Sequence, residues 1–379
     1  MNKRLLMAIA SALLATACIV SAIVILKNSK KNDEPSEVAK VSAGVDFLFE
    51  EYEGYGNSAP VIKEADGKRY LFYTTNEVAQ NKNTSIAMRV GKQKNGVWKY
   101  GEQKIVLRSA EDGWDSYNLS NADVVEGTFS YQGTKYSKLM VYQANNLEAE
   151  KRFQIGLAVS DSYEEGWVRV GEAPFITYDY EGYGDTYGVG NPSVFNVNGE
   201  GQVMIFYGYG STTVSCTRFV EADLSDLSKP ITSGAITVGS DALPLDGYEV
   251  AMIANADFKY DAAKEMVYMV KDGYPYATNN PQTATKVEVA KIPVRDLFKA
   301  KATWTNVVST IDGLELNGAP RVYAACLVSD GLGHIQDVDD LELGFTSNIA
   351  ATSEGDKKYE FYESLHGFEI PSTIREDTE

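Results

Sequence analysis

Three acidic residues stand where their side chains could do acid and base chemistry together. Asp123 and Asp257 each follow an asparagine by two residues at the start of a strand-like run, and residues i and i+2 of a β-strand point to the same side. Glu249 directly precedes the apolar run 250–253, a setting in which a carboxyl group keeps its proton. If these groups face one cavity, Glu249 can serve as a general acid and Asp123 or Asp257 as a general base or orienting carboxylate. The alternative role is structural, because Asn and Asp at strand starts accept hydrogen bonds from turn N–H groups.

The asparagines belong to a motif that recurs five times. Its copies lie 64, 70, 64 and 62 residues apart, and each is preceded by an acidic residue, a glycine and usually an aromatic residue. About 65 residues accommodate four strands with their turns, and repeated four-stranded sheets close radially into a propeller. We therefore predict five blades, whose motifs begin at Asn57, Asn121, Asn191, Asn255 and Asn317.

Residues 44–379 carry strand signals and almost no helical periodicity. Short runs rich in Val, Ile, Tyr, Phe and Thr alternate with hairpin turns such as Asp66-Gly67 and Asn198-Gly199. In the second repeat the pattern predicts four strands, at 122–125, 136–143, 153–160 and 167–171. The predicted fold class is therefore all-β, and one closed ring explains how residues 44–379 can form a single domain.

Several blade motifs resemble those of a known family. They are the run from Asp112 to Tyr117 (DGWDSY), the run from Lys138 to Tyr142 (KLMVY), the GLAVS strand that ends at Ser160 before Gly166-Trp167, and the run from Gly188 to Val194 (GVGNPSV). Together they resemble the five-bladed propellers of glycoside hydrolase family 43 and of the family 32/68 type. The resemblance implies action on poly- or oligosaccharides of the arabinan, xylan or fructan class. It also implies catalytic carboxylates on the first strands of successive blades, at the mouth of a central funnel.

The carboxylates that the resemblance implies are replaced in this chain. The family's positions fall on Ser58, on Asn121 and near Asn191, and neither an amide nor a hydroxyl can replace an acid–base carboxylate. Two functions therefore stay open. One is glycoside hydrolysis that uses Glu249 with Asp123 or Asp257, and the other is a catalytically inactive surface propeller that binds glycans or acts as a scaffold.

The glycine motifs supply candidate substrate-binding residues. Their aromatic side chains occupy equivalent places in four repeats, where flat rings could stack on sugars, or could instead pack one blade against the next. Acidic residues and the motif asparagines add hydrogen-bonding groups. The predicted substrate-binding residues are Tyr55, Trp114, Asp115, Asn121, Tyr183, Asp185, Asn191, Tyr248 and Asn255.

The composition excludes other classes of function. With 35 Lys+Arg against 53 Asp+Glu, the net charge of −18 disfavours binding to nucleic acid. Two histidines leave little material for a zinc site, so no metal and no cofactor is expected. His334 lies in a turn, and the acidic run 337–340 offers at most a structural calcium site without the usual spacing of ligands.

The N-terminal region predicts export. Residues 5–26 contain no charge and are long enough to cross a bilayer, so residues 1–26 read as a signal anchor, although the sequence before Cys18 is also compatible with a lipoprotein signal. Residues 27–43 read as a polar tether. We therefore predict a protein on the cell surface, anchored in the membrane. Cys216 and Cys326 are expected to be buried free thiols.

Overall fold

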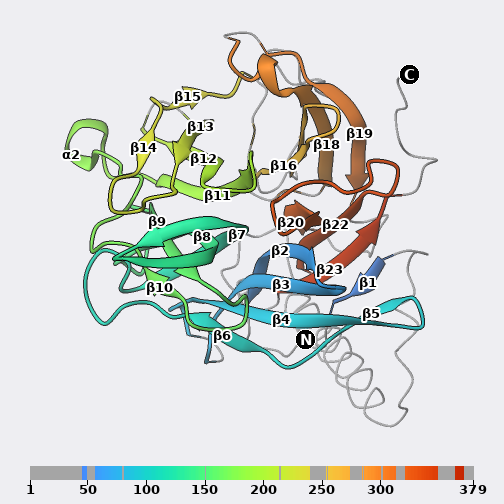
Figure 1. The fold of residues 1–379 in the computed structure, drawn as a ribbon, viewed down its shortest axis with the longest axis horizontal. Coiled ribbons are helices and arrows are strands. Elements are labelled where there is room, and N and C mark those ends of the chain that lie inside the picture. The colour runs from blue at the N-terminus through green and yellow to red at the C-terminus, as the bar shows by residue number, and fades with distance from the viewer. Residues whose placement is uncertain are drawn as a thin grey trace, which may run out of the picture. The chain divides into compact units, whose positions relative to one another are not determined.

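Five sheets, built mainly from antiparallel strands, follow one another along the chain and surround a common centre (Figure 1). The structure is a computed structural model, and the residues that it describes all belong to one compact unit that spans Gly44–Glu379. The described residues are 45–48, 56–78, 81–149, 151–212, 215–239, 253, 255–273, 284, 286–299, 302–312, 321–348 and 363–370.

The first two blades are formed by consecutive strands. Blade 1 contains β2 (Asn57–Ala65), β3 (Lys68–Thr75) and β4 (Ser85–Lys94), and both β5 (Val97–Tyr100) and β6 (Lys104–Leu107) pair with β4. Blade 2 contains β7 (Asn118–Tyr131), β8 (Thr134–Asn145), β9 (Gln154–Ser160) and β10 (Val168–Arg169). The four strands predicted in the second repeat are confirmed, although β7 is longer than expected.

Blades 3 and 4 repeat this order. The short helix α2 (Tyr180–Tyr183) precedes blade 3, which contains β11 (Gly188–Asn196), β12 (Gln202–Gly210) and β13 (Ser215–Asp223), with β14 (Ile231–Thr232) and β15 (Ile236–Thr237) paired to β13. Blade 4 contains β16 (Asp257–Asp261), β17 (Met266–Asp272), β18 (Lys286–Pro293) and β19 (Thr305–Asp312). A 3-10 turn, η2 (Val294–Asp296), follows β18.

Blade 5 joins the two ends of the propeller. It contains β20 (Arg321–Leu327), β22 (Glu342–Asn348) and β23 (Glu363–Glu369), and its outer strand is β1 (Val45–Phe47) from the start of the domain. The short strand β21 (Ser329–Asp330) pairs with β2 of blade 1. These pairings close the ring, and the prediction of a five-bladed propeller is confirmed.

The first strands of the five blades contact one another around the centre. In each blade one residue of this region has a left-handed backbone, with φ between 45° and 51°. A β-bulge follows at this point in blades 1, 2, 3 and 5. Asparagine tolerates this conformation better than most residues, which explains part of the recurring motif. The five left-handed residues are Ala59, Asn121, Asn191, Asn255 and Ala324.

This geometry corrects the alignment of two repeats. In blades 2, 3 and 4 the left-handed residue is the motif asparagine, as expected. In blade 1 it is Ala59, two residues after Asn57, and in blade 5 it is Ala324. The expected motif of blade 5 at Asn317 lies outside the described residues. The backbone therefore repeats in all five blades, whereas the asparagine is present at the equivalent place in only three.

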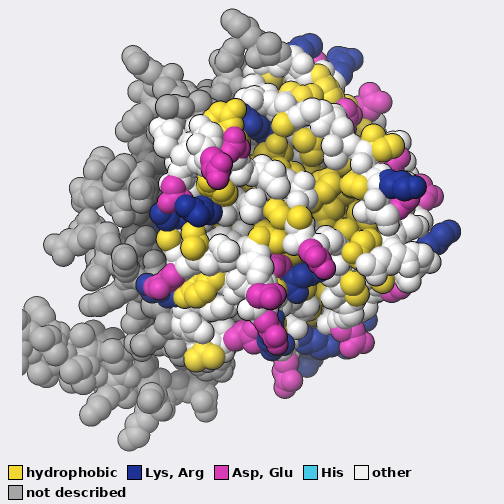
Figure 2. All heavy atoms as spheres, turned by 90° about the vertical axis from the view of Figure 1, so that its left-hand side faces the viewer, with side chains coloured by type: hydrophobic (Ala, Val, Ile, Leu, Met, Phe, Trp, Pro, Cys, Tyr) yellow, Lys and Arg dark blue, Asp and Glu magenta, His cyan; other side chains and the backbone are white. Residues whose placement is uncertain are grey.

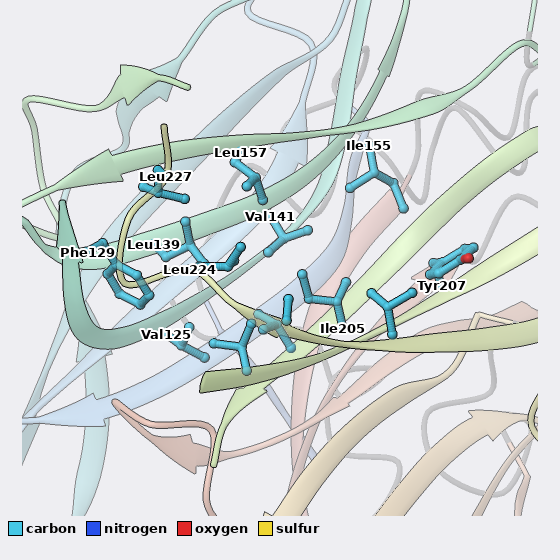
Figure 3. Packing of buried hydrophobic residues seen from close by; sticks show 14 of the residues in the cluster. Val125, Phe129, Leu139, Val141, Ile155, Leu157, Ile205, Tyr207, Leu224 and Leu227 are labelled. Carbon is cyan, nitrogen blue, oxygen red and sulfur yellow. The ribbon is translucent and has the colours of Figure 1, made fainter. Parts of the chain in front are cut away.

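The hydrophobic core lies between neighbouring blades. Figure 3 shows the layer between blades 2 and 3, where Val125, Leu139 and Val141 lie near Ile205 and Tyr207. Other clusters pair blades 3 and 4, blades 4 and 5, and blades 1 and 2. Full burial of a large aliphatic or aromatic side chain contributes about 1.5–3 kcal/mol, so these layers hold the ring together.

Two other predictions concern the cysteines and the N-terminus. Cys216 and Cys326 are both free, as expected; Cys326 is buried, while Cys216 is partly exposed. The predicted anchor at 5–26 and the tether at 27–43 lie outside the described residues. Within the part of the chain that is described, no helix is long and apolar enough to span a membrane.

Candidate functional site

The five left-handed residues surround a small cavity on the axis of the ring. Its volume is about 40 Å³, and residues of all five first strands line it. This is far below the volume of about 300–1,000 Å³ that sites for small-molecule ligands occupy. The cavity is lined mainly by Asn, Ala and Pro, and Asp257 is the only acidic residue among its described lining residues.

The three asparagines form a chain of hydrogen bonds around this cavity. Asn121 Nδ2 donates to Asn191 Oδ1, and Asn191 Nδ2 donates to Asn255 Oδ1 at 2.9 Å. Asn255 Nδ2 then donates to Asp272 Oδ2 at 2.6 Å, and Asp272 Oδ1 accepts from the backbone N–H of Ala324 at 2.9 Å. We call this set the amide girdle. It connects blades 2, 3, 4 and 5.

One step further along the first strands lies a buried cluster of two lysines and two aspartates. Lys63 Nζ lies 3.0 Å from Asp123 Oδ1, and Lys259 Nζ lies 2.9 Å from Asp123 Oδ2 and 2.5 Å from Asp257 Oδ1. The side chains of Lys63, Lys259 and Asp123 are completely buried, and that of Asp257 is 9% exposed. The two positive and two negative charges balance, which a buried cluster needs to be tolerated.

Backbone groups complete the cluster. Asp123 accepts from the N–H groups of Val124 and Val194 at 2.7 and 2.9 Å, in addition to both lysines. Asp257 accepts from the N–H of Leu327 at 2.9 Å and from the hydroxyl of Ser193 at 2.7 Å. An ionised carboxylate offers about four acceptor positions, so those of Asp123 are fully used.

The electrostatics of the cluster follow from burial and from these partners. Burial alone would raise the pKa of Asp123, but Lys259 and Lys63 outweigh it and hold the pKa at about 2. Burial would lower the pKa of Lys259, yet Asp123 and Asp257 raise it above its ordinary value. Burial lowers the pKa of Lys63, which Asp123 only partly opposes. Asp123 therefore stays ionised and firmly held.

A second set of hydrogen bonds joins neighbouring blades at four of the five junctions. A side chain on the second strand of one blade accepts from the N–H of the left-handed residue in the following blade. The pairs are Thr74 with Asn121 at 2.9 Å, Gln143 with Asn191 at 2.6 Å, Asp272 with Ala324 at 2.9 Å and Thr346 with Ala59 at 2.9 Å. Strand pairing places Gly208 at the equivalent position of blade 3, where no side chain is available.

Asp272 is a member of this site that the sequence analysis missed. Burial raises its pKa to about 7, although the hydrogen bonds from Asn255 and Ala324 and the nearby Arg321 and Lys271 act in the opposite direction. It stands at the end of a second strand rather than at the recurring first-strand motif. Only its position opposite the β-bulge of the next blade, where Ala324 lies, indicates that it belongs to the site.

The structure brings several of the predicted site residues together. Asn121, Asn191 and Asn255 do meet in the amide girdle, and Asp123 and Asp257 share the buried cluster beneath it. The predicted acid Glu249 and the predicted binding residues Tyr55 and Tyr248 lie outside the described residues.

Of the remaining predicted binding residues, Trp114, Asp115 and Asp185 are engaged in packing or ion pairs. Trp114 stacks on Tyr142 with ring centres 5.9 Å apart, and Asp115 is buried, accepting from Tyr142 at 3.1 Å and from Arg169 at 2.6 Å. These contacts favour the packing alternative for Trp114. Tyr183, on α2, is 57% exposed.

Asp185 and His334 also have protein partners. Asp185 pairs at the surface with Lys151 at 2.5 Å and with Arg152 at 2.6 Å. His334 Nε2 donates to the carbonyl of Asn196 at 2.6 Å. Among the described residues, no group of three or more His, Cys, Asp and Glu side chains is arranged to hold a metal ion.

The surface carries charges of both signs. On the side of the molecule shown in Figure 2, acidic and basic side chains are interspersed, with hydrophobic side chains between them. No continuous basic area is visible on this face, which agrees with the net charge of −18.

The fold is that of the five-bladed propellers found in glycoside hydrolases. A family 117 glycoside hydrolase from the marine bacterium Zobellia galactanivorans superimposes with a TM-score of 0.55 at 12% identity, covering 89% of this chain and 95% of that one. An α-L-arabinofuranosidase from Lactobacillus brevis gives 0.56 at 11% identity, covering 83% and 90%. The GH43_1 enzyme from Xanthomonas citri, complexed with xylotriose, gives 0.56 at 12% identity, covering 88% and 92%. No family model and no curated protein sequence matches the chain.

Proposed function

We propose that this protein binds poly- or oligosaccharides of the arabinan, xylan or fructan class at the centre of the ring, beside the amide girdle. The observation that carries the proposal is the composition of the lining of the axial cavity. It is formed by asparagine, alanine and proline around a cavity of about 40 Å³, and the aspartates expected to do chemistry are buried beside lysines. Related folds with oligosaccharides bound, such as the xylotriose complex, support the choice of ligand class.

Asp123 has a structural role in this proposal. A general base must reach the water that attacks the sugar, whereas Asp123 is completely buried and its acceptor positions are already occupied. Its four donors, Lys63, Val124, Val194 and Lys259, come from four blades, so the carboxylate ties the first strands together. An inverting pair of carboxyls would also need to stand about 6.5–9.5 Å apart with room for water between them, and the cavity beside Asp257 has little room.

Hydrolysis is the second candidate. It would use Glu249 as general acid and Asp257, which retains slight exposure and lines the cavity, as base or orienting carboxylate. The hydrolase fold of the similar structures favours keeping this candidate.

One set of measurements separates the two candidates. Isothermal titration calorimetry with arabino-oligosaccharides, xylo-oligosaccharides and fructans measures binding, and chromatography of the same mixtures measures cleavage. We expect binding without cleavage, unchanged in Glu249→Gln. Cleavage that disappears in Glu249→Gln would establish the hydrolase instead, and the absence of both binding and cleavage would contradict the proposal.

We also propose that residues 5–26 export the propeller and anchor it to the membrane. The support is the uncharged apolar run followed by the polar segment 27–43. Cell fractionation of the full chain and of a variant that lacks residues 1–26 tests this: the full chain should sediment with membranes and the truncated chain should not. A Cys18→Ala variant that is still anchored would favour the signal anchor over the lipoprotein.

A further inference from the structure

A pocket opens at the junction between blades 3 and 4, beside the amide girdle and away from the axis. Its volume is about 120 Å³. Blade 3 contributes Gly208, Gly210 and Thr217, and blade 4 contributes Asn255 and Phe258, with Tyr187 at the edge of β11. The pocket is distinct from the small axial cavity, although Asn191, Asn255 and Ala256 border both.

Two glycines on one strand create the pocket. The register between the first and second strands shows which positions are equivalent in the five blades. The position of Gly208 in blade 3 is held by Thr74, Gln143, Asp272 and Thr346 in the other blades. The position of Gly210 is held by Asn76 in blade 1 and by Asn145 in blade 2. On β12, residues 204 and 206 face blade 4, so the alternating positions 208 and 210 face it as well. Where blades 1 and 2 place polar side chains, blade 3 therefore leaves open space.

The hydrogen-bond pattern of the other blades indicates what the open space accepts. In blades 1 and 5 a threonine hydroxyl occupies this place and accepts from the N–H of the next left-handed residue. Gly208 offers no such oxygen to the N–H of Asn255. A ligand hydroxyl in the position of the missing threonine oxygen would accept the same hydrogen bond. The bonds made by Thr74 and Thr346 at the equivalent places show that the geometry is suitable.

We propose that this pocket binds one uncharged sugar unit of a glycan, with a ring hydroxyl accepting from the Asn255 N–H in place of a side chain. This rests on the proposed function and deepens it, because it names where a glycan is recognised. None of the described lining residues is charged, which favours a neutral ligand. Thr217 and Asn255 bring hydroxyl and amide groups to the lining and Phe258 brings an apolar ring, a combination suited to a sugar ring with both hydroxyl and C–H surfaces.

The size of the pocket restricts the ligand further. Sites for drug-sized molecules occupy about 300–1,000 Å³, whereas this pocket has a volume of about 120 Å³. The pocket therefore takes a single ring, such as a terminal or branching unit, while the rest of the glycan stays outside.

The Gly208→Thr variant tests the proposal. The Cβ atom would meet the Gly190 carbonyl oxygen at 3.4 Å, which is ordinary contact, and the φ of Gly208 does not require glycine. The threonine would fill the pocket and supply the missing acceptor, so the variant should fold with an unchanged or higher Tm. Gly208→Ala is a milder second variant.

A matched control is available in the same blade. Gly234, between β14 and β15, has nothing within 4 Å of a built Cβ atom, and its φ does not require glycine. Gly234→Thr therefore makes the same chemical change far from the pocket. Calorimetry would use D-xylose, L-arabinose and D-fructose, together with their oligosaccharides, on the full chain.

The expected result is at least a tenfold loss of affinity in Gly208→Thr, a smaller loss in Gly208→Ala and no change in Gly234→Thr. If the wild type binds these sugars and both Gly208 variants bind equally well, the pocket proposal is overturned while glycan binding stands. If only monosaccharides bind and Gly208→Thr abolishes this, the pocket stands and recognition of polymers fails. If the wild type binds no sugar at all, both proposals are overturned.

Discussion

The ammonium group of Lys259 lies 2.9 Å from the carboxylate of Asp123, although 136 residues separate the two in the chain. The contact joins the first strands of blades 2 and 4 through the centre of the ring. Lys63 approaches the same carboxylate from blade 1 at 3.0 Å. The central contact of this propeller is thus an ion cluster in which every carboxylate faces a lysine.

Replacing Lys259 tests the structural role of the cluster. Lys259→Met leaves Asp123 and Asp257 with only Lys63, so one buried negative charge is uncompensated. We expect the free energy of unfolding to fall by about 3–5 kcal/mol, measured by urea denaturation followed by circular dichroism. Lys99→Met, at an exposed position of β5, is the control and should change little. A loss below about 1 kcal/mol in Lys259→Met would contradict the assigned role.

The hydrogen bonds between blades can be tested at blade 1. Thr74→Val keeps the shape of the side chain but removes the acceptor for the Asn121 N–H. A buried donor without a partner costs about 1–3 kcal/mol, which the same denaturation experiment measures. Thr134→Val, at the exposed start of β8, makes the same change where no loss is expected. Equal stability of the two variants would show that the contact contributes nothing.

Asp272 should make the protein less stable as the pH rises. Its pKa is about 7 in the folded chain against 3.8 ordinarily, so between these values the folded state holds a proton that the unfolded state has lost. Stability then falls from about pH 4 to pH 7, by up to about 4 kcal/mol. Asp272→Asn should remove this fall, as thermal unfolding at several pH values would reveal. An unchanged pH profile in the variant would refute the assignment.

His366 should act in the opposite direction. Burial lowers its pKa to about 4 from 6.5, so as the pH falls below 6.5 the unfolded state gains a proton that the folded state refuses. Stability due to this residue is fully present above pH 6.5 and is lost towards pH 4, by up to about 3 kcal/mol. The effect is best measured in the Asp272→Asn background, where the opposing contribution is absent. His366→Phe, which keeps the stack on Phe345, should then flatten the profile, and a slope that persists would assign it elsewhere.

The repeat was predictable from the sequence because its causes are local. Turns such as Asn198-Gly199 and alternating apolar runs specify short strands wherever they occur, and a period near 65 residues leaves few architectures apart from a propeller. The asparagines could be placed at the starts of the first strands for the same reason. The asparagine motif did not locate the equivalent position in blades 1 and 5. There Ala59 and Ala324 adopt the left-handed backbone that asparagine adopts in the other three blades.

The chemical state of the site was not predictable. Lysine in a strand normally indicates a solvent-exposed position, yet Lys63 and Lys259 are completely buried because the carboxylate of Asp123, from another blade, meets both of them. Asp272 escaped notice because its partners, Asn255 and Ala324, are 17 and 52 residues away. Gly208 and Gly210 are not conspicuous in the sequence. Comparison with the other blades shows that they replace polar side chains at equivalent positions.

By itself, the sequence determined the five repeats, the strands within them and the acidic, aromatic character of the chain, because turns, strand periodicity and composition act over a few residues. Only the tertiary structure decided that Asp123 and Asp257 are neutralised by lysines, that three asparagines join into one girdle, and that a pocket opens between blades 3 and 4. Closing the ring brings together first strands that are far apart in the chain. Burial, charge pairing and open space at their meeting points depend on that closure.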